Sequence, residues 1–376
     1  MPSEHAVLSA SSAYRWIQCP PSVKLCDEFE DVATVYAQEG TDAHSMCEYK
    51  VKKLLGLNVE NPCENLEYFN EEMDQCSDDY AAFASEEIER LRQMDGFDPL
   101  VEVEKRLEYS RWVPGGFGTG DLVVVGRKEL TIIDFKYGQG VAVSAEMNPQ
   151  MMCYALGALD IWDGIFDFEV VNMKIFQPRI SNYSSFILSP SEIYTWADEV
   201  LCPAANLAIN GEGEFKSGEH CRFCKAKAVC RKRAEDNLMM AKYDFKPPEL
   251  LEETEISIIL DKCDELIKWA NDVKDYALDY ICRGNHIPGY KVVEGRSVRK
   301  YSNEKDVIKA VEEAGFDPYD KKLLPITSMQ KRLGKDKFNE ILGNLVVKPQ
   351  GKPTLAVESD KRPPMNSASS DFSEND

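Results

Sequence analysis

Two aspartates and one lysine lie in neighbouring segments that are otherwise rich in valine, isoleucine and leucine. The segments read GTGDLVVVG and ELTIIDFKYG, and they contain Asp121, Asp134 and Lys136. If a two-residue turn at Arg127 and Lys128 joins them as antiparallel strands, Asp121 lies directly opposite Asp134, with Cβ atoms roughly 5 Å apart. Lys136 lies on the same face, two residues further on. A three-residue loop would separate the two aspartates.

These two carboxylates need positive charge beside them. The strands are apolar on both faces, as buried strands are, and at an effective dielectric constant near ~20 two charges roughly 5 Å apart repel by about 3 kcal/mol. Lys136 can offset one charge, and a hard cation such as Mg²⁺ or Mn²⁺ can offset both. Such a cation activates water and stabilises the charge that develops on a phosphate. The pattern therefore predicts phosphodiester hydrolysis; the alternative is a surface-facing Asp–Lys–Asp cluster on a half-exposed hairpin.

Three cysteines within ten residues form a second motif, Cys221, Cys224 and Cys230. A thiolate metal centre needs a fourth ligand, and Cys19 is available early in the chain, with Cys26 as its main competitor. Four thiolates suit an iron–sulfur cluster and a structural Zn²⁺ alike. Either would close a loop of roughly 200 residues and so stabilise the fold.

Two helical segments carry further candidates. Gln150 and Tyr154 share one face of a helix that begins at Pro149, because residues four apart are neighbours, and the first amides of a helix attract an anion. His44 lies in another helical segment. The alternatives are a buried tyrosine with a surface glutamine, and an ordinary capped or core histidine.

The chain of 376 residues carries a formal charge of −21 and contains 12 cysteines. This charge excludes indiscriminate binding to a polyanion, so any contact with nucleic acid has to be local. Residues 216–236 hold seven basic and three acidic side chains, which indicates either a solvated helix face or a surface for DNA. No signal-peptide pattern and no run of ~20 apolar residues is present. We expect a cytoplasmic protein with reduced thiols and no membrane partner.

The order of elements predicts one mixed α/β domain, with a central sheet flanked by helices. Residues 8–56 and 61–94 have helical patterns, and residues 100–138 contain three strands. A helix follows Asn148, and a fourth strand precedes a helix at residues 189–210.

Three parts are expected along the chain. Residues 1–240 form the domain that carries the N-terminal helices, the aspartates and the cysteine metal site. Residues 245–350 form a mainly helical accessory region with one long helix at 252–283. Residues 359–376, rich in Ser, Asp and Pro, form a disordered tail.

Over about residues 8–235, the motifs together resemble the RecB-like branch of the PD-(D/E)XK nucleases. They occur in that family's order, as Glu39-Gly40-Thr41-Asp42-Ala43-His44, Gly120-Asp121, Asp134-Phe135-Lys136 and Gln150-x-x-x-Tyr154. The resemblance implies a restriction-endonuclease-like core in which His44, Asp121 and Asp134 hold the metal ion. It also implies that Lys136 assists the attacking water, and that Gln150 and Tyr154 orient the DNA strand.

The cysteines resemble those of the iron–sulfur subgroup of this family, of the AddB and CRISPR-adaptation exonuclease type. The resemblance implies that one early cysteine and a late trio bind a [4Fe–4S] cluster. The four ligands are Cys19, Cys221, Cys224 and Cys230. A structural Zn²⁺ is the alternative.

The function that this resemblance implies is a Mg²⁺- or Mn²⁺-dependent deoxyribonuclease, specifically a DNA exonuclease of phage or prophage recombination or of DNA-end processing. Its partners would be DNA and a single-strand annealing recombinase or a helicase. Two alternatives use the same fold: a structure-specific endonuclease, and a non-catalytic scaffold that binds DNA or protein.

Overall fold

The computed structural model describes residues 6–30, 35–238, 253–295, 301–319, 323–347, 358 and 360. The chain divides into two compact units, Met1–Val293 and Glu294–Asp376. Apart from Asp360, the tail expected at 359–376 lies outside the described residues. Among the described residues, no helix combines the length and the apolar character needed to cross a membrane.

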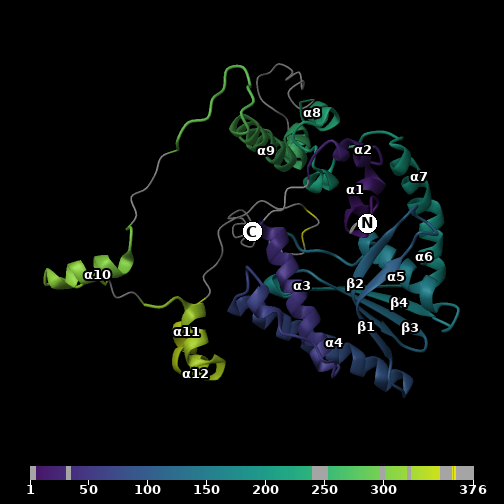
Figure 1. The fold of residues 1–376 in the computed structure, drawn as a ribbon, viewed down its shortest axis with the longest axis horizontal. Coiled ribbons are helices and arrows are strands. Elements are labelled where there is room, and N and C mark those ends of the chain that lie inside the picture. The colour runs from purple at the N-terminus through teal and green to yellow at the C-terminus, as the bar shows by residue number, and fades with distance from the viewer. Residues whose placement is uncertain are drawn as a thin grey trace, which may run out of the picture. The chain divides into compact units, whose positions relative to one another are not determined.

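The first unit is built on a five-stranded mixed sheet in the order β1-β2-β3-β4-β5 (Figure 1). The strands are β1 Leu100–Glu108, β2 Phe117–Val125, β3 Glu129–Phe135, β4 Val170–Gln177 and β5 Asn182–Leu188. β3 and β4 are parallel and every other neighbouring pair is antiparallel. A parallel pair needs a crossover, which the helix α5 (Pro149–Trp162) supplies. The predicted mixed α/β fold is therefore confirmed.

One expected detail of this sheet is wrong. The sequence pattern predicted four strands, and the fifth, β5, lies between the fourth strand and the helix expected at 189. β5 pairs with β4 at the edge of the sheet and alternates half-buried and exposed side chains. Such an edge strand lacks the continuous apolar run that marks the buried strands, so its signal was weak.

Helices cover both faces of the sheet (Figure 1). One face packs on α5 together with α1 (Ala13–Gln18), α6 (Pro190–Trp196) and α7 (Cys202–Asn210). The other face packs on α3 (Val35–Leu54) and α4 (Glu71–Asp95). Because neither face meets water, β2 and β3 can carry Val, Leu and Ile at almost every position.

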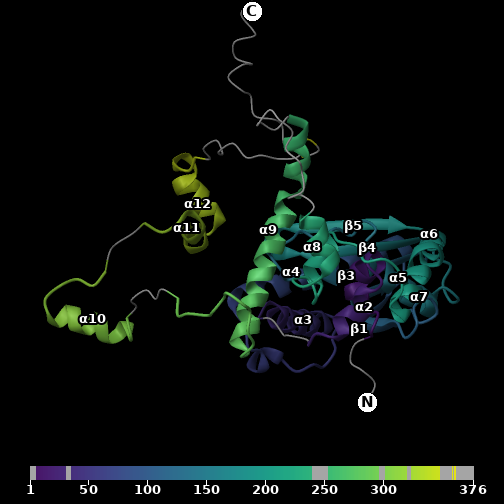
Figure 2. The same cartoon turned by 90° about the horizontal axis from the view of Figure 1, so that it is seen from above.

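Three further α-helices lie in the described part of the first unit. They are α2 Ser22–Asp27, α8 Arg231–Leu238 and α9 Glu253–Cys282, with a 3-10 turn at Glu219–Phe223. α9 confirms the long helix expected at 252–283, and it packs beside α8 (Figure 2). Arg233 of α8, 1% exposed, pairs with Glu265 and Asp272 of α9 at 2.7 and 2.6 Å.

The second unit contains three short α-helices in its described part. They are α10 Glu304–Glu313, α11 Ile326–Leu333 and α12 Lys335–Leu342. The side chain of Asn303 caps α10 by accepting from the amide of Lys305. Phe338 of α12 is buried.

The β2–β3 hairpin has the register that the sequence predicted. Leu122 pairs with Ile133 and Val125 with Leu130. The amide of Gly126 donates to the carbonyl of Glu129 at 2.9 Å, which closes a turn with two central residues. This register sets Asp121 across from Asp134.

Candidate active site

The two aspartates lie where β2 and β3 separate. The ladder between these strands ends at Leu122 and Ile133. Beyond that point β2 pairs only with β1, while β3 continues beside β4. The carboxylate of Asp121 enters the gap and accepts a hydrogen bond from the amide of Phe135 at 2.7 Å. The side chain of Asp121 thus takes the place of a backbone acceptor between the two strands. This hydrogen bond fixes the position of one oxygen of Asp121.

Asp134, Lys136, Gln150 and Tyr154 form one connected network. Lys136 Nζ lies 2.8 Å from Asp134 Oδ2 and donates to Gln150 Oε1 at 3.1 Å. The amide nitrogen of Gln150 donates to Asp134 Oδ1 at 3.2 Å and to the Tyr154 hydroxyl at 3.0 Å. The structure therefore brings these four predicted site residues together on the α5 side of the sheet.

His44 reaches Asp121 from α3, in the helical layer on the other face of the sheet. Its Nδ1 lies 3.2 Å from Asp121 Oδ1. The ring packs edge-on against Phe135, with centroids 5.4 Å apart. Since His44 belongs to α3 and Gln150 to α5, the site spans the separated strands from one helical layer to the other.

Glu104 of β1 is a member of this site that the sequence analysis missed. A His44 ring nitrogen and one carboxylate oxygen each of Glu104 and Asp121 lie within 4.8 Å of one another. Val103 and Lys105 pair with Leu122 and Gly120, so Glu104 stands beside Asp121. The length of the loop between β1 and β2 hid this register. The one available signal was a glutamate in the middle of a strand.

The electrostatics of the site reflect crowded carboxylates. Burial raises the pKa of Asp121, but the charge and hydrogen bond of His44 bring it below its usual range. Burial also raises the pKa of Asp134; Lys136 opposes this, Asp121 adds to it, and the net shift is upward. Burial, then the charge of Asp121, raises the pKa of Glu104 to about 7. The three carboxylates of the site thus outnumber its two basic side chains, those of His44 and Lys136.

The two basic groups respond in the opposite sense. Burial lowers the pKa of His44, but Asp121 outweighs this and raises it to about 9. Burial also lowers the pKa of Lys136, and its ion pair with Asp134 raises it above the usual value. Both groups are therefore cationic at neutral pH when no metal ion is bound.

A buried tyrosine lies within electrostatic reach of the same carboxylates. Tyr80 of α4 is 2% exposed, and its hydroxyl has no hydrogen-bond partner in the described part of the chain. Burial raises the pKa of this phenol, and the charges of Asp121, Asp134 and Glu104 add to the effect.

The donor set fits a hard divalent cation. Carboxylate oxygens suit Mg²⁺ and Mn²⁺, and the one imidazole nitrogen favours Mn²⁺ of the two. A cation would also relieve the repulsion that raises the pKa values of Asp134 and Glu104.

The amides at the start of α5 are already satisfied. The Asn148 side chain accepts from the amides of Gln150 and Met151 at 3.0 and 3.3 Å. Asn148 thus caps the helix, which begins at Pro149 as the sequence predicted. The idea that these amides attract an anion loses support, because capping has used two of them.

The cysteines meet at a different place, between the N-terminal helices and the turn before α8. Cys26 Sγ lies 3.7 Å from Cys224 Sγ, and Arg15 approaches Cys26 at 3.5 Å. The hydrogen bond from Cys224 lowers the pKa of Cys26 to about 6. Cys26, the competitor to Cys19, thus has its thiol beside Cys224, one member of the trio.

No three cysteine sulfurs among the described residues lie within 4.8 Å of one another. Around one tetrahedral Zn²⁺, Zn–S bonds of about 2.3 Å place sulfurs about 3.8 Å apart, and Cys26 and Cys224 lie at about that separation. The thiolates of a [4Fe–4S] cluster bind four different irons and stand further apart.

The basic segment at 216–236 is partly neutralised. Lys227 pairs with Asp272 at 2.8 Å and Lys232 with Asp236 at 2.7 Å, while Arg233 is buried in its pairs with α9. Arg222 lies 5.7 Å from the ring of Phe223, which is 78% exposed. A cavity of about 460 Å³ connects both residues with Val141, in the loop that follows Lys136.

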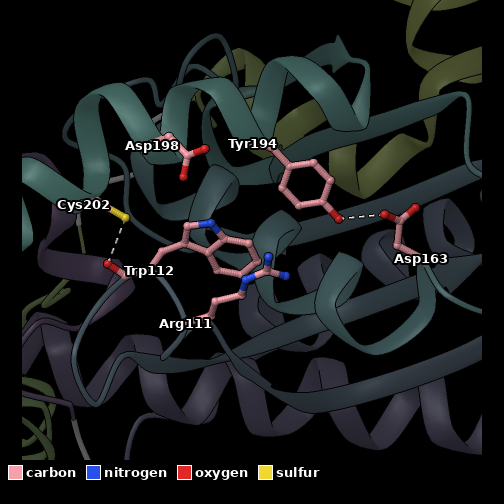
Figure 3. Close-up of a pocket in the computed structure, with 6 residues that line it drawn as sticks. All are labelled: Arg111, Trp112, Asp163, Tyr194, Asp198 and Cys202. Atoms are coloured by element: carbon pink, nitrogen blue, oxygen red, sulfur yellow. Dashed lines mark hydrogen bonds between the residues drawn. The ribbon is translucent and has the colours of Figure 1, made fainter.

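A second cavity, of about 360 Å³, contains none of these residues (Figure 3). Its lining consists of Arg111, Trp112, Asp163, Tyr194, Asp198 and Cys202. Tyr194 stacks on Trp112 with centroids 5.9 Å apart and donates to Asp163 at 2.8 Å. The Cys202 thiol donates a hydrogen bond to the carbonyl oxygen of Trp112, at 3.2 Å. These contacts tie α6 and α7 to the loop after β1.

The fold and the site define an α/β protein with a carboxylate-rich centre at separating strands. The chain belongs to the family described as "Protein of unknown function (DUF2800)", whose sequence pattern matches residues 5–363. A solved structure titled "Crystal structure of SSO0001" is similar at 13% sequence identity, over 50% of this chain and 95% of that chain, with a TM-score of 0.22.

Proposed function

We propose that this protein is a PD-(D/E)XK nuclease of the RecB-like type, a DNA exonuclease that hydrolyses phosphodiester bonds with Mg²⁺ or Mn²⁺. One observation carries the proposal: Asp121, Asp134 and Lys136 converge where β2 and β3 separate. Buried carboxylates gathered beside a lysine are costly unless they are used.

The residues divide the chemistry between them. Asp121 and Asp134, with His44, would hold the cation, which supplies an activated water and charge stabilisation. Because its ion pair raises its pKa, Lys136 stays protonated at neutral pH. It therefore acts as a fixed positive charge that orients the water or balances the phosphate, not as a base.

Gln150 and Tyr154 act as positioning residues in this proposal. The amide of Gln150 contacts Asp134, Lys136 and Tyr154 at once. It thereby holds the lysine and the carboxylate in one geometry, and with Tyr154 it would orient the DNA strand.

The test is cleavage of end-labelled linear DNA with and without Mg²⁺. Asp134→Asn should keep DNA binding and lose at least about 100-fold in cleavage rate, the size of effect expected when electrostatic stabilisation is removed. Asp160→Asn, an exposed position on the same helix as Gln150, is the control and should cleave normally. A wild-type protein that binds DNA and never cleaves it would favour the scaffold alternative.

Substrate topology separates the two nuclease alternatives. An exonuclease digests linear DNA from its ends and leaves covalently closed circles intact. Cleavage of closed circles at defined structures would replace our proposal by a structure-specific endonuclease. The setting in phage-type recombination, with an annealing recombinase or a helicase as partner, rests on the resemblance alone.

We also propose that an N-terminal cysteine and the trio Cys221, Cys224 and Cys230 bind a [4Fe–4S] cluster, with structural Zn²⁺ as the alternative. The turn that contains Cys221 packs on α1, next to the segment that contains Cys19 and Cys26. Iron, sulfide and zinc analysis of the purified protein decides between the metals. Cys19→Ser and Cys26→Ser, compared side by side, identify the fourth ligand by loss of metal.

A further inference from the structure

The two edges of the sheet differ in charge. β1 forms one edge, and five of its nine residues are charged: Glu102, Glu104, Lys105, Arg106 and Glu108. Charged side chains on an edge strand oppose its pairing with another chain. β5 forms the other edge (Figure 2), and its seven residues contain neither a charge nor a proline. The β5 edge therefore lacks the protection that the β1 edge has.

The outer side of β5 is open in the described part of the chain. There β5 pairs with β4 alone, so the backbone groups that point away from β4 meet no further strand. Tyr183, Ser185 and Ile187 share one face of β5, and all three are exposed. The exposed fractions of Tyr183 and Ile187 are 59% and 53%. An exposed apolar edge without charge is a template for another strand.

The opposite face of β5 holds the strand firmly in the fold. The Asn182 side chain donates to the carbonyl of Val143 at 2.9 Å, and the amide of Ala145 donates to Ser184 Oγ at 2.9 Å. Phe186 packs against the apolar cluster under α5. β5 is thus an ordered edge, and a partner strand that pairs with it does not have to order it first.

The sequence of β5 is complementary to a second copy of itself. When two β5 strands run antiparallel about a two-fold axis at Ser185, Tyr183 of each copy lies opposite Ile187 of the other. Both residues belong to the exposed face, and an aromatic residue opposite a β-branched one is a favourable cross-strand pair. Charge favours the same contact. Two copies of a chain with net charge −21 repel where acidic surfaces meet, and β5 itself carries no charge.

We propose that the chain forms a two-fold dimer in which the β5 strands of two copies pair antiparallel, with Ser185 at the axis. The pairing joins two five-stranded sheets and uses both open edges, so the assembly closes at two copies. A strand of seven residues is about 23 Å long. The contact is therefore small, and a dissociation constant in the micromolar range is expected. The dimer does not depend on the proposed function.

The test measures the mass of the full chain by sedimentation between about 1 and 100 µM. The wild type should pass from monomer to dimer over this range. Ile187→Lys places a charge on the open edge and should weaken the dimer by at least about tenfold. Leu100→Lys is the matched control, because Leu100 is 42% exposed on the opposite edge strand β1, and it should dimerise like the wild type. Both positions are exposed, so both variants should melt at the wild-type temperature.

A second variant tests the register. Ser185→Cys sets two thiols opposite each other at the axis, where Cβ atoms are roughly 5 Å apart. A short bismaleimide should join two copies through this position, which peptide mass spectrometry identifies. Three results would overturn the proposal: a wild type that stays monomeric at about 100 µM, an Ile187→Lys chain that dimerises like the wild type, or a dimer without the link at position 185.

Discussion

At the scale of single residues, His44 and Asp121 form an ion pair that a cation has to displace. Asp121 raises the pKa of His44 to about 9 despite burial. Because this pKa is above the ordinary value near ~6.5, the pair stabilises the metal-free protein fully below pH ~6.5. The contribution is lost as pH rises through about 9.

This competition predicts that cation affinity rises with pH. A metal ion binds the neutral ring, so each bound ion releases the His44 proton. The Mn²⁺ affinity should increase by up to about tenfold per pH unit between pH 7 and 9, as linkage to one proton requires. Isothermal titration at several pH values measures this. His44→Gln should flatten the slope, and an equal slope in both proteins would exclude His44 as the linked group.

A second residue-scale prediction concerns the close approach of β2 to Tyr154. A Cβ at Gly118 would lie 2.7 Å from Cε1 of that ring. Gly118→Ala should push the ring away and disturb its bond with Gln150. Since displacements of about 1 Å near a reacting centre can cost ~100-fold in rate, cleavage should fall by tenfold or more. Gly138→Ala, with open space at its Cβ, is the control and should cleave normally.

At the scale of elements, the contact of α5 with β1 depends on a glycine. A Cβ at Gly157 would lie 2.9 Å from Leu107 Cβ and 3.0 Å from its backbone carbon. Backbone cannot swing aside as a side chain can, so Gly157→Ala should lower the free energy of unfolding by about 1–3 kcal/mol. Gly164→Ala meets nothing within 4 Å and should change it by less than ~0.5 kcal/mol. Urea denaturation of both variants measures the difference.

Local patterns predicted the parts of the site that a short turn or a single helix determines. The hairpin turn at Gly126–Glu129 fixes the register of Asp121 against Asp134, and four-residue helical spacing places Gln150 with Tyr154. Such local patterns do not predict that Glu104 and His44 lie near Asp121, because their approach depends on the β1–β2 register and on how α3 packs on the sheet. The same holds for Cys26 and Cys224, which meet only through the tertiary packing of α2.

At the scale of the whole molecule, the chain is strongly acidic, with a net charge of −21. Basic side chains outnumber acidic ones locally, in the segment 216–236. The segment at 216–236 looked like a basic surface for DNA, yet Lys227, Lys232 and Arg233 hold acidic partners. Fewer cations than the sequence suggested are left to contact phosphate there. Binding to DNA should therefore draw less on this segment than its basic composition suggests.

The division into two units yields the last prediction. Every candidate ligand and every cysteine lies in Met1–Val293, which has its own apolar core on both faces of the sheet. α9 belongs to this unit through the buried Arg233, so a chain that ends at Val293 keeps that helix. Such a chain should unfold cooperatively and bind Mn²⁺ with the wild-type stoichiometry.

The family pattern extends to residue 363, so the second unit belongs to the family protein, while the candidate ligands named above all lie in the first unit. We expect its removal to change DNA affinity or substrate choice while the cleavage rate at saturating DNA stays within about threefold, since ΔG‡ is set by the groups around the cation. Circular dichroism melting, Mn²⁺ titration and single-turnover cleavage of both chains measure these quantities. A truncated chain that folds and binds Mn²⁺ but no longer cleaves would show that the second unit contributes to the reaction itself.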